Sequence, residues 1–459
     1  MADLAFDIAR AVRDSGGRAL FVGGWVRDRL LGIPSKDLDI EVYGLPAARL
    51  RRLLERFGRV DAVGEQFTVF KVGGLDVALP RRESKTGHGH RGFNVQGDPS
   101  MPIVDATRRR DFTINAILLD PLSGDYIDPF RGREDLERRV LRVVDEHSFA
   151  DDSLRVLRGL QFAARFELTA DPRTKDICRA IPLDDLPSER VIAEFEKLLL
   201  LARTPSIGFI LGRELGVIDR LMPEMAALAG CPQEPEWHPE GDVWVHTLLV
   251  LDESRHAIGD LDRARGMAVM LGAICHDFGK PATTAVIDGR IRSPNHEPAG
   301  VPLATAFLDR LNVHTLDGFD VRRHVLGLVA YHLAPGMWHK APSPVGDGAF
   351  RRLAQKVDLE LLARLARADC RGRTGAFDCS AMDWFVARAR ALGVEHRPPE
   401  PLLKGRHLLA MGMTPGPAVG RITRAVYERQ LDGTVVSLED AVAAGRDLLN
   451  AGPVPGPGD

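Results

Sequence analysis

The sequence predicts an α+β fold, in which a first part with a small mixed sheet is followed by a long, mostly helical part. Short apolar runs between Gly and Pro residues fill positions 1 to about 145, a pattern typical of strands and turns. From Ser148 onward, apolar residues recur instead at the spacing of amphipathic helices. A chain of 459 residues is too long for one compact core, so we expect these parts to divide into several domains.

Five apolar runs predict the strands of the first part, at residues 19–22, 38–42, 68–72, 75–79 and 117–119. The first run leads through Gly23-Gly24 into a short helix, which we expect to end before Gly32 and Pro34. In the second part, apolar residues at helical spacing predict one helix over 154–166 and another over 191–199.

Breaks in the helical pattern predict the domain boundaries. Proline-containing segments lie near 231–241 and 341–347, and the last residues, GPVPGPGD, are typical of a frayed end. We expect a head over 1–145, a helical neck over 146–230, a third region over 231–375, a helical C-terminal region over 376–450 and a disordered tail over 451–459.

The composition is that of a globular protein. The formal net charge is −3, and 44% of the residues are hydrophobic. No run approaches the roughly 18 apolar residues that cross a bilayer, and the first ten residues contain no apolar signal segment. We therefore expect a cytoplasmic location without membrane contact. The five cysteines show no metal-type pairing, which predicts free buried thiols.

Carboxylates at alternate positions of the second run predict a metal site. Asp37 and Asp39 would lie on one face of a strand, roughly 6 to 7 Å apart. Such a pair can hold two divalent ions, and Mg²⁺ is the natural occupant because few carboxylates plus substrate phosphates suffice to bind it. Asp76 is a candidate third ligand or base. Upstream, Gly23 and Gly24 would let backbone N–H groups approach a triphosphate.

Several segments between residues 18 and 200 carry a family resemblance. In order they are VGGWVRDRLLG, KDLDIEVYG, LPRRESKTGHGHRGF, RRRDFTINAI, IDPFRGREDL and FADDSLRVLRGLQFAARF. Together they resemble the class II tRNA nucleotidyltransferases, CCA-adding enzymes of the DNA polymerase β-like superfamily that are close in sequence to bacterial poly(A) polymerases. The resemblance implies a polymerase-β-like nucleotidyltransferase head, followed by a neck that selects nucleotides and binds RNA.

The resemblance also implies roles for single residues of the head. Gly24 and Arg27 would contact the nucleoside triphosphate, and Asp37 and Asp39 would hold the catalytic Mg²⁺ ions. Arg110 and Asp111 would recognise the incoming ribose and separate NTP from dNTP, which suits the charge-assisted hydrogen bonds that Arg and Asp make.

In the neck, the resemblance implies an amino-acid template that reads the Watson–Crick edge of C or A. Its residues are Asp152, Arg155 and Arg158, which we expect on one stripe of a helix. Two positions depart from the family: Asp151 stands where Glu is usual, and Gln161 stands where Arg is usual.

The Gly-rich segment 81–93 resembles the flexible loop that the family uses when it switches from CTP to ATP. Arg82, Lys85 and Arg91 make the segment basic. Its composition fits a disordered surface loop equally well.

A second set of metal-ligating residues lies further along the chain. Imidazoles and carboxylates on several helices can converge in a bundle core and bind one or two transition ions. The order of His246, His276-Asp277 and Asp369 resembles the H…HD…D signature of HD phosphohydrolases, with His296 and His332 as ligands of a second metal.

In one bacterial subgroup such an HD domain is fused to the tRNA nucleotidyltransferase. The fusion implies metal-dependent phosphatase and 2′,3′-cyclic phosphodiesterase activity for residues 231–375, with Ni, Mn, Co or Fe as the ion. An Asp commonly stands in that subgroup where this chain has Leu333.

We therefore expect template-independent transfer of CMP and AMP from CTP and ATP to the tRNA 3′ end. No protein partner is evident.

Three alternative specificities share the same motifs: A addition, CC addition or poly(A) polymerisation. A further alternative is an HD phosphohydrolase with an RNA-binding head, and a degenerate HD domain that only docks tRNA also fits. Segments 81–110 and 351–373 each carry seven Lys or Arg against three Asp or Glu, so selected faces are expected to meet RNA.

Overall fold

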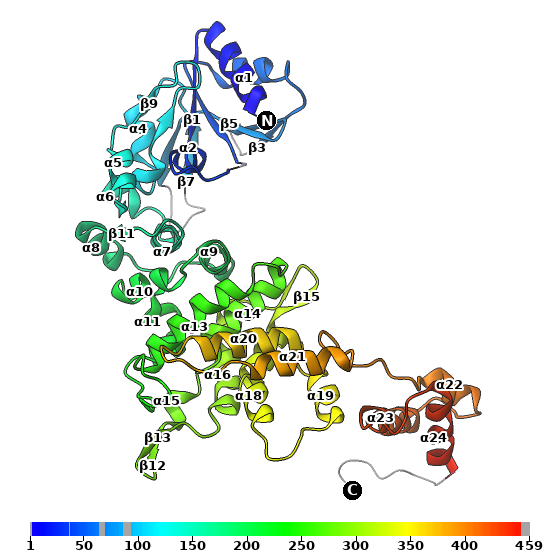
Figure 1. Ribbon diagram of the computed structural model, residues 1–459. Helices are drawn as coiled ribbons and strands as arrows, with labels where there is room; N and C mark the ends of the chain where they lie inside the picture. The colour runs from blue at the N-terminus through cyan, green and yellow to red at the C-terminus, as the bar shows by residue number, and fades with distance from the viewer. Residues whose placement is uncertain (1, 36, 64–68, 86–92, 451–459) are drawn as a thin grey trace. The chain divides into compact units, whose positions relative to one another are not determined.

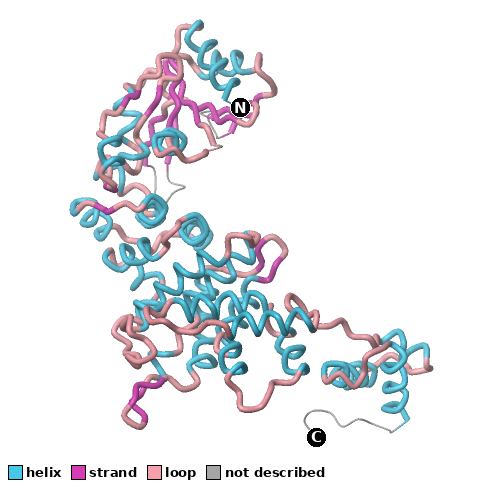
Figure 2. The backbone as a smooth tube through the Cα atoms, in the orientation of Figure 1, coloured by secondary structure: helices cyan, strands magenta, loops and turns pink. Residues whose placement is uncertain are grey.

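The computed structural model describes residues 2–35, 37–63, 69–85 and 93–450, and divides the chain into two compact units, Met1–Leu221 and Met222–Asp459. Figure 2 shows that strands gather in unit 1, whereas unit 2 is helical apart from short hairpins. The predicted α+β class is confirmed. The finer division into head, neck, HD and C-terminal regions stays a prediction. None of the described helices is long and apolar enough to cross a membrane.

A seven-stranded sheet in the order β3-β4-β5-β2-β1-β8-β9 frames unit 1. β2 and β5 pair in parallel, with Asp39 opposite Asp76, and the other neighbours pair antiparallel. The strands of the sheet are β1 (Arg18–Val22), β2 (Asp39–Tyr43), β3 (Val60–Val63), β4 (Val69–Val72), β5 (Leu75–Ala78), β8 (Leu118–Leu119) and β9 (Tyr126–Ile127).

The two faces of this sheet differ. Ile40 of β2 and Val77 of β5 belong to the core that also contains buried residues of α1 (Ala2–Asp14) and α3 (Ala47–Leu54), and Figure 1 shows α1 alongside the sheet. Because side chains alternate along a strand, Asp39 and Asp76 point to the opposite face. The parallel pairing thus places the two carboxylates side by side.

The remaining helices of unit 1 include the two that the apolar spacing predicts. The predicted helices over 154–166 and 191–199 are present as α7 and α9. The helices are α2 (Gly24–Leu30), α4 (Ile103–Arg108), α5 (Gly132–Glu137), α6 (Glu146–Phe149), α7 (Leu154–Phe166), α8 (Pro172–Ala180), α9 (Ser188–Leu201), α10 (Ser206–Glu214) and α11 (Val217–Leu221), with a 3₁₀ turn at Thr113–Asn115 and the short parallel pair β10 (Val140–Leu141) and β11 (Thr169–Ala170).

Two local predictions in unit 1 are wrong. Asp37 does not lie in a strand with Asp39, because β2 begins at Asp39. The segment 81–93 is not wholly a loop. β6 (Arg81–Lys85) pairs antiparallel with β7 (Phe93–Gly97), in a register that sets Lys85 opposite Phe93. Residues 86–92, which include Arg91 and the glycines of this segment, lie outside the described residues.

Helices that pack on one another build unit 2. α13, α14, α16, α17 and α20 form the bundle, and α22, α23 and α24 have an apolar core of their own. The helices are α12 (Pro223–Ala226), α13 (Val243–Ala257), α14 (Arg263–Cys275), α15 (Lys280–Thr283), α16 (His296–Arg310), α17 (Val321–Tyr331), α18 (Ala334–His339), α19 (Asp347–Ala354), α20 (Leu359–Arg371), α21 (Ala381–Ala391), α22 (Gly405–Ala410), α23 (Pro417–Leu431) and α24 (Leu438–Asn450), and the hairpins are β12 (Ala285–Ile287) with β13 (Arg290–Arg292) and β14 (Thr315–Leu316) with β15 (Phe319–Asp320).

The cysteines correct one expectation. Cys178, Cys231 and Cys275 are free and buried, as predicted. Cys370 and Cys379 instead form a disulfide, with their Cα atoms 6.0 Å apart. Cys370 lies near the end of α20, and the loop that follows returns to it before α21 begins, which the spacing of the cysteines did not reveal.

Gly279 is a test of the bundle's packing, because it lies against the start of α16. A Cβ atom at Gly279 would stand 2.0 Å from the backbone oxygen of His296, whereas a Cβ at Gly420, in the exposed part of α23, meets nothing within 4 Å. Gly279→Ala should therefore destabilise unit 2 by roughly 1–3 kcal/mol, and Gly420→Ala should stabilise it by up to about 1 kcal/mol. Urea unfolding followed by hydrogen exchange in peptides of unit 2 measures the stability of both variants. Equal changes in stability would contradict this packing.

Candidate active sites

A cavity of about 850 Å³ opens on the carboxylate face of the sheet in unit 1. Side chains from the sheet, from the segment 109–115 and from α7 and α9 line it. Every residue predicted for the head and the neck except Asp37 is among them: Gly23, Gly24, Arg27, Asp39, Asp76, Arg110, Asp111, Asp152, Arg155 and Arg158. The structure thus brings these separated motifs to one place.

Carboxylates gather on one side of this cavity. Burial and then the neighbouring Asp76 raise the pKa of Asp39 to about 6, and the exposed Asp37 adds to this effect. The positive charge of Arg110 lowers the pKa of Asp39 and so partly offsets this rise. Asp76 itself accepts hydrogen bonds from Lys71 Nζ at 2.8 and 3.0 Å. Two carboxylates side by side at one cavity fit a divalent cation with oxygen ligands, although Lys71 already pairs with Asp76.

The glycine turn before α2 keeps this side of the cavity open. Gly23 has φ 74°, a left-handed conformation that favours glycine. A Cβ there would stand 3.4 Å from Arg110 Nη1 and 3.8 Å from Asp39 Oδ2. The turn therefore leaves room for a ligand beside Asp39.

The Arg27 side chain is more buried than expected for a residue that binds a phosphate directly. It is 4% exposed, donates to Asp28 and to Asn115 Oδ1, and lies 4.2 Å from the centroid of the Phe166 ring. Burial lowers its pKa. Arg27 is thus a lining residue held in place by Asp28 and Asn115, and its predicted contact with the triphosphate stays a prediction.

Asp111 is the centre of a hydrogen-bond network at the cavity wall. Its carboxylate accepts from Arg158 Nε at 2.7 Å, from Asn115 Nδ2 at 3.0 Å and from the Phe112 backbone N–H at 2.8 Å. Burial by itself would raise the pKa of Asp111, but Arg158 and these donors hold it below its usual value. Asp111 therefore pairs with Arg158, a residue predicted for the base template, and not with Arg110.

The template residues line the cavity, but one expectation about them is wrong. Asp152 does not share a helical stripe with Arg155 and Arg158, because α7 begins only at Leu154. Asp152 accepts from Arg190 Nη2 at 3.1 Å, and Arg155 donates to the backbone oxygens of Ser148 and Arg109 at 2.6 and 2.8 Å. Arg190 was missed because nothing in the sequence links α9 to α7.

The six predicted HD residues converge in unit 2, each 7% exposed or less. Asp242 caps the start of α13 and Asp358 that of α20, which fixes the helices that carry His246 and Asp369. His276 and Asp277 follow α14, His296 begins α16, and His332 follows α17. Two trios bring their ligand atoms within 4.8 Å of one another: His246 with His276 and Asp369, and Asp277 with His296 and His332.

Three of the imidazoles are held in the same way. Nδ1 of His276, His296 and His332 each lies 2.8 to 2.9 Å from a backbone oxygen, so each Nδ1 donates and each Nε2 keeps its lone pair. Nε2 of His296 then faces Nε2 of His332 at 3.3 Å. Burial and the neighbouring His276 and His296 lower the pKa of His332 to about 3, which keeps that ring neutral. Two lone pairs that face each other fit a cation between them.

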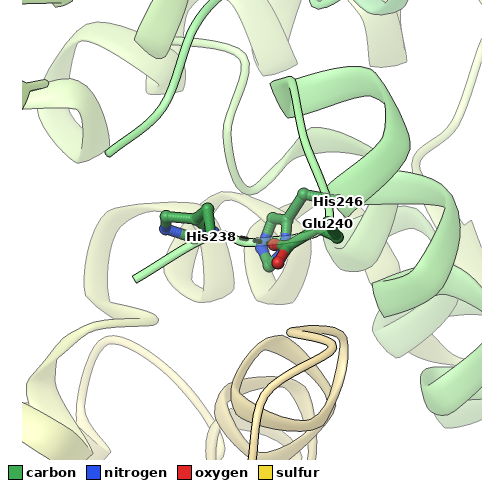
Figure 3. A group of neighbouring side chains, drawn as sticks. All are labelled: His238, Glu240 and His246. Atoms are coloured by element: carbon green, nitrogen blue, oxygen red, sulfur yellow. Dashed lines mark hydrogen bonds and ion pairs between the residues drawn. The ribbon is translucent and has the colours of Figure 1, made fainter. Parts of the chain in front are cut away.

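Glu240 orients His246 and was missed by sequence reasoning. A single oxygen of Glu240 accepts from Nδ1 of His238 at 2.9 Å and from Nδ1 of His246 at 2.8 Å, as Figure 3 shows. His246 Nε2 then points to Asp369 Oδ1 at 3.0 Å. Burial by itself would lower the pKa of His246, but the bonds to Asp369 and Glu240 raise it. The sequence signal that could have identified Glu240 is a carboxylate six residues before the candidate ligand His246, in a proline-containing segment.

Asp277, a member of the second trio, also lies next to the first trio. Its Oδ2 lies 3.2 Å from His276 Nε2, and its Oδ1 lies 3.4 Å from His296 Nε2. Lys280 Nζ forms an ion pair with Oδ2 at 2.7 Å. Among the described residues, His276 Nε2 and both Asp277 oxygens are buried without a well-aligned hydrogen bond. These orphaned ligand atoms are those that a bound metal would satisfy.

Family models match two segments of the chain. Residues 19–142 match the poly A polymerase head domain, and residues 172–228 match the probable RNA and SrmB-binding site of polymerase A. These matches cover the sheet with its carboxylates and the helices after the template.

Curated relatives match most of the chain. The multifunctional CCA protein of Laribacter hongkongensis is 36% identical over 370 residues, 78% of this chain and 86% of its own length. That of Thioalkalivibrio sulfidiphilus is 36% identical over 425 residues, 89% of this chain and 96% of its own length. Among solved structures, the Bacillus stearothermophilus CCA-adding enzyme in complex with CTP shares the fold, with a TM-score of 0.66, 23% identity and 98% of each chain covered.

The Asp111 network predicts a stability difference within unit 1. Asp111→Ala removes three hydrogen bonds to a buried carboxylate and leaves Arg158 without its partner, so unit 1 should lose about 2–3 kcal/mol. Asp61→Ala is the control, since the Asp61 pair with Arg59 has side chains 62% and 89% exposed and should be worth less than about 0.5 kcal/mol. Urea unfolding followed by hydrogen exchange in peptides of unit 1 compares them. Equal losses would argue against the network.

Proposed function

The chain belongs to the family of multifunctional CCA proteins, which are tRNA nucleotidyltransferases, and we propose that it adds CMP and AMP from CTP and ATP to the 3′ end of tRNA. The observation that carries the proposal is the placement of Asp39 beside Asp76, next to the Gly23 turn and inside a cavity lined by arginines. Carboxylates for a cation and basic groups for a triphosphate are both needed for nucleotidyl transfer, and this cavity offers both.

In the transfer, the terminal 3′ oxygen of the RNA bonds to the α-phosphorus, and the bond to pyrophosphate breaks. Asp37 and Asp39, with Asp76 beside them, are the residues that would hold Mg²⁺, which when bound activates the attacking oxygen and neutralises the departing charge. The backbone N–H groups after Gly23 and the Arg110 guanidinium face the same space and suit the phosphates of CTP or ATP.

Base selection is assigned to Asp152, Arg155 and Arg158. Each side chain is anchored at the cavity wall: Asp152 by Arg190, Arg155 by two backbone oxygens and Arg158 by Asp111. Anchored donors and acceptors keep one geometry, which is what discrimination between bases requires. The bond between Arg158 and Asp111 also joins base selection to the residue proposed for ribose recognition.

A second function is favoured by the orphaned ligand atoms of unit 2. We propose a metal-dependent phosphohydrolase site, in which His246, His276 and Asp369 hold one ion and His296 with His332 hold another. Asp277, with one oxygen near each set, would serve both. Mixed imidazole and carboxylate ligands suit Ni, Mn, Co or Fe, and the bound ion would polarise a phosphoryl oxygen and generate a hydroxide nucleophile.

The first prediction from this proposal concerns product sequence. Given tRNA that ends before CCA, the chain should add C, C and A with both nucleotides present, and only C with CTP alone. Asp39→Ala should lower incorporation at least about 100-fold, because it removes a ligand of the cation that stabilises the transition state. Asp61→Ala, at an exposed site, is the matched control. Gel ladders of the tRNA 3′ end measure the order of addition and the incorporation by each variant. Addition of A with ATP alone to unstructured RNA, without use of CTP, would favour a poly(A) polymerase and contradict the proposal.

The second prediction concerns the metal in unit 2. Mn²⁺ or Ni²⁺ should raise the unfolding temperature of unit 2 in the wild type but not in His276→Ala plus Asp277→Ala. Glu240→Gln should weaken metal affinity about 10- to 100-fold, because Glu240 fixes the ring that presents Nε2 of His246.

Calorimetric titration of the metal-free chain measures these affinities. Glu236→Gln is the matched control, since the exposed Glu236 pairs only with Arg290 at 3.1 Å among the contacts described for it, and it should leave affinity unchanged. Wild-type affinity in Glu240→Gln would show that Glu240 does not position the ligand.

A further inference from the structure

The cavity above the HD residues has an aromatic side that the proposed phosphohydrolase chemistry does not use. It measures about 380 Å³, and Trp237, Lys340 and Arg373 line it together with Asp277, His332 and Asp369. The indole of Trp237 stacks on Phe377, with ring centroids 6.5 Å apart and an interplanar angle of 28°. Trp237 is nevertheless 43% exposed. A large apolar ring supported by a second ring and still open to solvent is a surface for a flat ligand.

Trp237 is tied to the ligand cluster through its neighbour in the chain. His238 follows it directly and shares an oxygen of Glu240 with His246. The aromatic surface therefore has a fixed position relative to the HD residues. A ligand with a phosphate among these residues can reach the indole with its other end.

Positive charges accompany both ends of the cavity. Lys280 Nζ lies 2.7 Å from Asp277, and an Arg373 amino group lies 3.9 Å from Asp369. Lys340 Nζ lies 5.9 Å from the centroid of the Trp237 ring, and the Arg373 guanidinium lies 5.5 Å from that of Phe377. Cations that can contact a phosphate, next to rings that can stack on a base, are the combination that binds nucleotides.

We propose that Trp237, supported by Phe377, binds the nucleobase of the substrate of the HD site and so determines its preference for nucleoside phosphates over phosphate esters without a base. The assignment rests on the proposed phosphohydrolase function and deepens it. Trp237 is a specificity-determining residue on this account, because the phosphoryl group reacts at the histidine and aspartate ligands and not at the indole.

The experiment compares two phosphate monoesters, adenosine 2′-phosphate and glycerol 2-phosphate, with the Mn²⁺-loaded full-length chain. All variants carry Asp37→Ala and Asp39→Ala, so that nucleotidyl transfer does not interfere. Trp237→Ala should weaken calorimetric binding of adenosine 2′-phosphate about tenfold, the usual effect of losing one base stack. KM should rise to a similar extent with kcat little changed, because the lost contact is equal in ground and transition states.

Three controls separate stacking from structural damage. Glycerol 2-phosphate should bind and react equally in the Asp37→Ala plus Asp39→Ala parent and in the same parent with Trp237→Ala. Trp237→Phe keeps a flat ring and should recover most of the affinity for adenosine 2′-phosphate. Met337→Ala removes another exposed apolar side chain, 63% exposed, that does not line this cavity, and should change nothing.

The outcomes distinguish this inference from the proposed function. Equal losses for both ligands in Trp237→Ala, or no loss for either, would overturn the role of Trp237. Failure of adenosine 2′-phosphate to bind the Asp37→Ala plus Asp39→Ala parent would also overturn the role of Trp237. Binding that depends on Trp237 without hydrolysis of either compound would support the base site and contradict the phosphohydrolase activity.

Discussion

Both candidate sites depend on one constraint: the surrounding fold holds ligand atoms of like polarity close together. In unit 2, Nε2 of His296 faces Nε2 of His332 at 3.3 Å, and backbone oxygens fix the tautomer that makes both lone pairs point inward. In unit 1, the parallel register of β2 and β5 sets Asp39 beside Asp76. Such arrangements cost free energy unless a cation joins the groups, so they are typical of metal sites and rare as purely structural features.

The rest of each unit supports these clusters. In unit 1 the Asp111 carboxylate connects Arg158 of α7 with Asn115 of the 3₁₀ turn before β8, so the residues proposed for base selection and for ribose recognition share one network. In unit 2 the candidate ligands lie on or directly after five helices, and Glu240 binds the His246 imidazole from outside the cluster. Charged groups that hold one another in a fixed geometry need little reorganisation when a phosphate arrives, which is the basis of electrostatic catalysis.

Sequence patterns predicted the elements well and the long-range partners poorly. Alternation in the run 38–42 and the apolar stripe of 154–166 gave β2 and α7, because both depend on local periodicity. The order of the histidines and aspartates, read with the family resemblance, predicted six residues that the structure brings together in unit 2, and their role as metal ligands stays a prediction. Local patterns could not show that Asp111 binds Arg158, 47 residues away, or that Arg190 holds Asp152. They placed Asp37 in a strand and Asp152 on a helix because a one- or two-residue shift of an element's start leaves the periodicity unchanged.

The central claim is that two separate metal-dependent sites carry two chemistries on one chain. The most direct measurement assays nucleotide incorporation into tRNA and hydrolysis of a 2′,3′-cyclic nucleotide in the same preparations of two double variants. Asp37→Ala plus Asp39→Ala should abolish incorporation and keep hydrolysis, and His276→Ala plus Asp277→Ala should do the reverse. Incorporation that survives loss of both aspartates, or loss of both activities in each correctly folded variant, would contradict the claim.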